Sequence, residues 1–85
     1  MGFRMIKIFV LGDIMYVFFT EDSRKGAEKV FQEIRRCQKE GRTTEKVLAY
    51  NLDRISWARK VYERVVAECE KSQDCYELLP EHVVC

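Results

Sequence analysis

The chain has 85 residues, of which 47% are hydrophobic and 34% are charged, and its formal net charge is +1. This length leaves no room for a second hydrophobic core, and the composition excludes a disordered chain. The nearly neutral charge excludes a strong overall attraction to nucleic acid. We therefore expect one small α+β domain over residues 1–85, of a size that a disulfide, a metal or a partner chain commonly supplements.

Residues 4–20 have the pattern of a β-hairpin. The segments 4–11 and 14–19 are rich in β-branched and aromatic residues, which favour strands. Gly12 and Asp13 lie between them and suit a type II′ turn, because glycine accepts the positive φ of the first turn position. The sequence therefore predicts a hairpin that closes over these two residues.

Both faces of this predicted hairpin are apolar, and strands of this kind are normally covered on both sides. We expect the helices of one chain to cover one face and a second copy to cover the other face or the free edge. The sequence thus predicts a homodimer. The aromatic residues expected at its interface are Phe9, Tyr16, Phe18, Phe19 and Trp57.

A first helix is predicted from about Ser23 to Glu40. Ala27, Val30 and Ile34 follow a helical spacing along one face. Gly41 follows at the position where a left-handed residue commonly ends a helix.

The segment after Gly41 allows two interpretations. An apolar stripe at helical spacing runs from Leu48 through Ile55 to about Lys71, and this continuity favours one long helix that starts after Thr44. The alternation within residues 47–52 also allows a third strand, followed by a helix over 54–71. The first interpretation gives ββαα with a short extended C-terminal tail, and the alternative is ββαβα. In the tail, we expect one helical turn over 76–79 and a short edge strand over 82–85.

Three of the four cysteines gather near the C-terminus with the only histidine, as Cys69, Cys75, His82 and Cys85. These are zinc-ligand types, but the tight cysteine pair of a structural zinc site is missing, so no metal and no cofactor are predicted. A disulfide between Cys75 and Cys85 is the preferred pairing, because it would fix the tail.

Basic residues outnumber acidic ones between Arg35 and Arg64, where Tyr50 and Trp57 could stack on bases. The residues of this possible nucleic-acid interface are Arg35, Arg36, Lys39, Arg42, Arg54, Arg59, Lys60 and Arg64. Interleaved glutamates and the absence of a known binding motif make this the second hypothesis for function.

No arrangement of residues indicates catalysis, and no signal peptide or membrane segment is recognisable. The leading hypothesis is therefore a small, non-catalytic, homodimeric interaction or adaptor protein located in the cytoplasm. A DNA- or RNA-binding accessory protein is the alternative. Abundant charged residues, few amides and several cysteines are typical of intracellular proteins of hyperthermophiles. We therefore expect the source to be a hyperthermophilic archaeon or one of its mobile elements.

Overall fold

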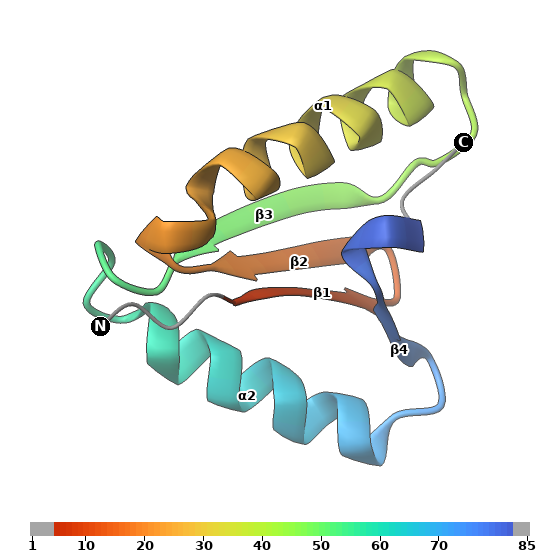
Figure 1. Cartoon of the computed structure of the whole chain (residues 1–85). Coiled ribbons are helices and arrows are strands. Elements are labelled where there is room, and N and C mark those ends of the chain that lie inside the picture. The colour runs from red at the N-terminus through yellow and green to blue at the C-terminus, as the bar shows by residue number, and fades with distance from the viewer. Residues whose placement is uncertain (1–4, 83–85) are drawn as a thin grey trace.

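The computed structural model describes residues 5–82. The elements in this range follow one another as β1 (Ile6–Leu11), β2 (Ile14–Phe19), η1 (Glu21–Ser23), α1 (Arg24–Lys39), β3 (Lys46–Asn51), α2 (Ala58–Lys71), β4 (Cys75–Leu78) and η2 (Pro80–His82). The described strands form one mixed sheet in the order β3–β2–β1–β4, with α1 on one face and α2 on the other (Figure 1). The predicted α+β class is confirmed.

The N-terminal hairpin forms as predicted. β1 and β2 pair antiparallel, with Leu11 opposite Ile14 next to the turn. Gly12 has a φ of 63°, and no described residue other than glycine has a positive φ, as a type II′ turn requires. Local turn chemistry therefore sets the register of the two central strands.

Helix α1 also follows its local signals. It begins at Arg24, and Gly41 lies just beyond its end with a φ of 73°. This left-handed conformation suits glycine and stops the helix. α1 then connects β2 to β3, which pairs parallel to β2.

The preferred long helix over the middle of the chain is wrong, and the strand alternative is correct for this segment. Lys46–Asn51 forms β3, and α2 begins only at Ala58. The apolar stripe is compatible with both structures, but β2 offers a vacant edge that β3 fills along its whole length. After β3, the Asn51 side-chain oxygen accepts hydrogen bonds from the backbone N–H groups of Asp53 (2.9 Å) and Arg54 (3.2 Å), which turns the chain toward α2.

The predictions for the tail are also wrong. The expected helical turn is the strand β4, which pairs antiparallel with β1 and places Leu78 opposite Ile8. A 3-10 helix over Pro80–His82 occupies the start of the segment expected to be an edge strand. The rest of that segment, residues 83–85, lies outside the described range.

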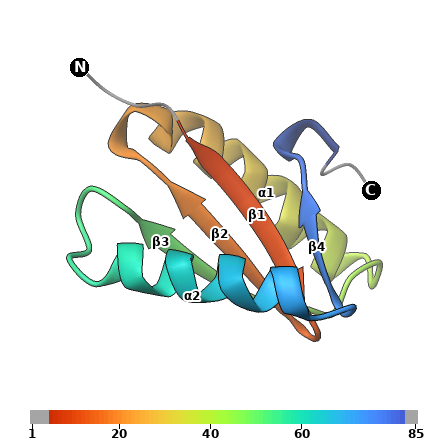
Figure 2. The same ribbon diagram turned by 90° about the horizontal axis from the view of Figure 1, so that it is seen from below.

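The two helices bury opposite faces of the hairpin. On the α1 face, Ile8 and Val17 are completely buried with Ile34 of the helix. On the α2 face, Phe18 is completely buried in a cluster with Val65 of the other helix. Figure 2 shows α2 lying across its face of the sheet. The expectation that one chain can cover only one face of the hairpin is therefore wrong, because the strand insertion sends the second helix to the opposite side.

Within residues 5–82, neither helix combines the length and the apolar character needed to cross a lipid bilayer. The cores on both faces centre on β1 and β2, and this leaves the edge strand β3 less well covered.

Candidate binding edge along strand β3

The outer edge of β3 is open. Lys46 N donates to Asp13 O (2.9 Å), and Leu52 N donates to Phe19 O (2.8 Å), so these residues bond toward β2. Every second residue of a parallel strand faces the same neighbour, and Val47 and Ala49 therefore direct their N–H and C=O groups away from β2. No described strand pairs with them. This row of donors and acceptors can accept a further strand.

The opposite edge of the sheet is protected. β4 is four residues long and is followed by Pro80, which has no N–H group. The Glu77 carboxylate also accepts a hydrogen bond from Lys7 Nζ at 3.1 Å, which places charges along this edge. Short strands, prolines and charges are common means of blocking edge pairing. β3 is six residues long and carries a single charged residue, Lys46, at its beginning.

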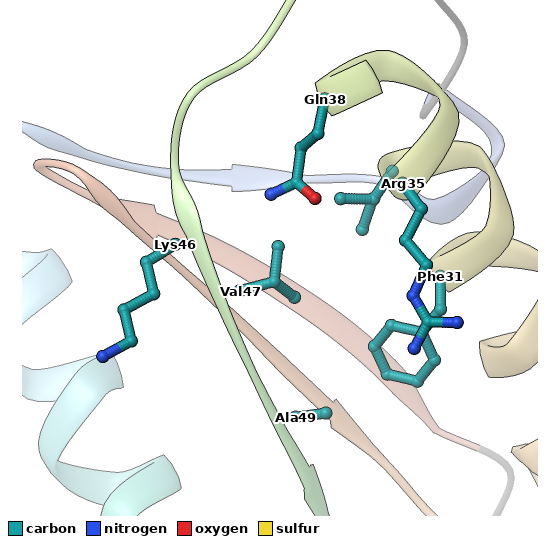
Figure 3. A pocket seen from close by; sticks show the side chains of 7 residues that line it. Phe31, Arg35, Gln38, Lys46, Val47 and Ala49 are labelled. Carbon is teal, nitrogen blue, oxygen red and sulfur yellow. The ribbon is translucent and has the colours of Figure 1, made fainter.

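A hollow of about 410 Å³ lies between α1 and β3. Phe31, Ile34 and Arg35 line it from the helix, and Val47 and Ala49 line it from the strand (Figure 3). Ala49 is exposed although it belongs to a strand. The hollow therefore offers an apolar floor with a guanidinium group on the helix side.

Two further residues border this hollow. Gln38 Nε2 donates to the backbone oxygen of Glu45 at 2.9 Å, which ties the end of α1 to the start of β3. The Lys46 side chain points to the other side of the strand, toward α2 (Figure 3). Lys46 therefore contributes little to the hollow itself.

Aromatic side chains lie on the α2 face next to the same edge. Tyr50 stacks on Phe18 with ring centroids 5.3 Å apart and on Tyr16 at 6.4 Å. Trp57 meets Tyr50 edge to face at 5.5 Å and is 55% exposed. The surface around the β3 edge is thus aromatic on one face and hollowed on the other.

A polar network fixes the C-terminal end of β3. The Glu21 carboxylate accepts hydrogen bonds from Arg54 Nε (2.8 Å) and from Asn51 Nδ2 (2.7 Å), and Asp53 Oδ2 accepts one from the Glu21 backbone N–H (2.6 Å). The bonds from Arg54 and then Asn51 hold the pKa of Glu21 below its usual range. The edge is therefore presented by a strand whose end is held in place.

The eight basic residues predicted as a nucleic-acid interface do not gather on one face. Arg35, Arg36 and Lys39 belong to α1, whereas Arg59, Lys60 and Arg64 belong to α2 on the other side of the sheet (Figure 1). Arg42 follows α1, and Arg54 lies in the turn before α2.

Three of these basic residues are also held by acidic neighbours. Arg36 lies 2.8 Å from Glu33 and 3.3 Å from Glu40. Arg42 pairs with Glu40 at 3.4 Å, and Arg54 pairs with Glu21 at 2.8 Å. The preferred interpretation of the sequence did not place the basic residues of α1 and those of α2 on opposite faces of the sheet. Their separation depends on β3, which is inserted between the two helices.

The five residues predicted at a dimer interface also lie in different parts of the structure. Phe9 and Phe18 are buried against α2 of the same chain, and Phe19 meets Phe31 of α1 edge to face at 6.0 Å. Tyr16 is half-buried, and Trp57 is exposed. Only Tyr16 and Trp57 of this set therefore contribute to the aromatic surface near the β3 edge.

Cys75 pairs with Cys69, not with the predicted Cys85, which lies outside the described residues. The disulfide joins the end of α2 to the start of β4, and the six-residue separation made this the tightest loop available to Cys75. Among the described residues no cysteine is free. Two of the four residues considered for zinc are thus joined to each other, and residues 5–82 contain no cluster of three or more His, Cys, Asp or Glu side chains that could hold a metal.

The outward-facing backbone of Val47 and Ala49 was not predicted as a site. The sequence does contain a sign of this site, because residues 46–51 alternate as a strand does and include one charged residue. This pattern indicates a binding edge only when the segment is known to lie at the edge of the sheet. Comparison of the chain with models of protein families, with curated proteins and with solved structures finds no match.

Proposed function

We propose that this chain is a non-catalytic interaction protein that binds an extended protein segment by strand addition along β3. The open backbone of Val47 and Ala49 is the observation that carries this proposal. In strand addition, main-chain hydrogen bonds supply affinity, and pockets for alternate side chains supply specificity.

The surroundings of the edge fit this mode of binding. Side chains of an added strand point alternately to the two faces of the sheet. On one face they meet the hollow beside Phe31 and Arg35. On the other face they meet Tyr50 and Trp57, which are half-buried and exposed respectively. Aromatic and arginine side chains are enriched among the residues that dominate binding energy at interfaces.

The substitution Ala49→Pro tests the proposal. It removes the outward N–H of residue 49 and leaves the hydrogen bonds between β3 and β2, and proline is tolerated where the N–H of an edge strand faces solvent. Peptides selected from a random library on the immobilised, dilute full chain provide the probe. We expect Ala49→Pro to weaken their binding at least about tenfold, since the loss of one hydrogen bond and a new clash exceed about 1.4 kcal/mol.

Ala49→Val is the matched control, because it keeps the outward N–H and should retain most of the peptide affinity. Amide chemical shifts should change at Val47 and Ala49 when peptide is added. Selected peptides that bind equally well to Ala49→Pro would contradict strand addition at this edge.

Nucleic-acid binding is a second candidate, supported by one observation on α2. Arg59, Lys60 and Arg64 form no ion pair with another described residue, and the exposed Trp57 immediately precedes this helix. The double variant Lys60→Glu, Arg64→Glu tests it. On this hypothesis the wild-type chain binds single strands at ~50 mM salt, and affinity falls steeply with rising salt and in the variant. No binding at ~50 mM salt excludes this candidate.

A further inference from the structure

We infer that the segment added to β3 is β3 of a second copy of this chain, antiparallel to the first across a two-fold axis beside Ala49. This inference rests on the proposed function and names its partner. Outward-facing residues meet outward-facing residues in such a pair, so Ala49 lies opposite Ala49 of the second copy. Val47 then lies opposite Asn51 of the second copy, whose N–H can donate to Val47 O, and the pair repeats by symmetry. The Asn51 carbonyl already accepts hydrogen bonds from the Arg54 and Ile55 N–H groups of its own chain, so the outward N–H bond of this pairing is made at Ala49.

The charges at the two ends of β3 are complementary in this orientation. Lys46 at the beginning is exposed and forms no ion pair with any residue in the range 5–82. Asp53, just after the end of the strand, is exposed as well. Antiparallel pairing brings Lys46 of each copy next to Asp53 of the other, whereas parallel pairing brings the two lysines together. Opposite charges across strands stabilise pairing, and like charges oppose it.

The same charges select the register. Outward residues must stay opposite each other, so the register can shift only in steps of two residues. One shift moves Lys46 past the end of β3 of the second copy to the turn that holds Arg54, where no strand remains to pair with it and a positive charge lies close. The opposite shift moves Lys46 to Tyr50 and away from Asp53. The register centred on Ala49 also places at the two-fold axis the residue with the smallest side chain among those whose backbone faces outward.

In this register the apolar residues of β3 on the α2 face contact apolar residues of the second copy. Leu48 and Tyr50 are both half-buried in the single chain, and the register places each opposite the other residue type of the second copy. Aromatic and aliphatic residues that face each other across strands stabilise a sheet. The paired sheet would end on both sides at β4, whose edge is the protected one.

Sedimentation of the full chain tests the partner. We expect the wild-type mass to rise from one copy to two with concentration. Ala49→Pro should remain a monomer with an unchanged far-ultraviolet circular dichroism spectrum. Ala49→Val, which keeps the edge, and Tyr76→Lys, which alters the exposed face of β4, should both remain dimers. A wild-type chain that stays monomeric at ~1 mM, or a dimer that survives Ala49→Pro, overturns the inference.

Cysteine cross-linking tests the register. Ala49→Cys should form a covalent dimer on mild oxidation, because directly opposite Cα atoms lie about 5.5 Å apart. Val47→Cys should not, because its two copies are separated by four residues along the strands, or about 14 Å. Cross-linking of Val47→Cys without Ala49→Cys would overturn the register.

The two proposals fail in different ways. If the wild-type chain is monomeric but still binds peptides through the Ala49 edge, strand addition is supported and the second copy is rejected as the partner. A dimer that is insensitive to Ala49→Pro, together with peptides that are also insensitive, rejects both.

Discussion

At the scale of single residues, Phe18 lies at the centre of the packing between the sheet and α2. It is completely buried, and its ring lies 5.1 Å from Tyr62 and 5.3 Å from Tyr50. Phe18→Ala should lower the free energy of unfolding by about 3–5 kcal/mol, since a buried aromatic ring leaves a cavity when removed. Chemical denaturation measures this loss. Trp57→Ala, at an exposed position, is the control and should cost less than about 1 kcal/mol; equal losses would contradict the packing described.

Glu21 gives a residue-scale prediction that depends on pH. Arg54 and Asn51 lower its pKa in the folded chain, so its ionised form contributes stability above the ordinary glutamate pKa, and this contribution is lost as pH falls through the lowered value. Glu21→Gln should therefore unfold at a lower temperature than wild type at pH 7. The difference should shrink in acid. Thermal unfolding of both chains between pH 2 and 7 checks it, and a difference that is constant with pH would contradict the role of the charge.

At the scale of elements, local signals predicted the hairpin and α1 correctly. Gly12 and Gly41 each fix a positive φ, the strand segments are rich in β-branched and aromatic residues, and the segment of α1 has a clear helical periodicity. β3 was ambiguous, because its alternating residues also continue a helical stripe. The vacant edge of β2 resolves that ambiguity, and this edge is a property of the sheet, not of the segment. The candidate binding edge could not be predicted from the sequence for the same reason. An edge strand can be recognised only when the order of the strands in the sheet is known.

The element β4 depends on contacts that no local pattern reveals. It pairs with the distant β1, and the Cys69–Cys75 disulfide holds its first residue to α2. Replacing both cysteines by serine should cost about 2 kcal/mol by the chain-entropy estimate for a loop of this size. Denaturation without reductant measures it.

The loss should appear first as faster amide exchange in β4. Lys7→Ala, which removes the exposed ion pair to Glu77, is the comparison and should cost less than about 1 kcal/mol. Unchanged exchange in β4 of the serine variant would contradict a stabilising role of the disulfide.

At the scale of the whole molecule, one helix on each face lets a single chain bury both sides of its hairpin. On our proposal a partner binds at the edge of the sheet and is not needed to cover the core. Thermal stability of the wild-type chain should therefore rise with protein concentration, because a partner that binds only the folded state stabilises it. Ala49→Pro should lack this dependence and unfold near the value of dilute wild type. Calorimetry over a hundredfold range of concentration checks it; a concentration-dependent Ala49→Pro variant would contradict the account.

Residue-resolved amide hydrogen exchange along β3 tests the open edge most directly. In dilute wild-type protein, the amides of Leu48 and Tyr50 should be protected by β2, while those of Val47 and Ala49 exchange rapidly. At high concentration the amide of Ala49 should become protected as well, because it faces Ala49 of the second copy. Uniform protection along β3 in the dilute chain, or rapid exchange at Ala49 that no concentration slows, would contradict the proposal that this edge binds a second strand of the same chain.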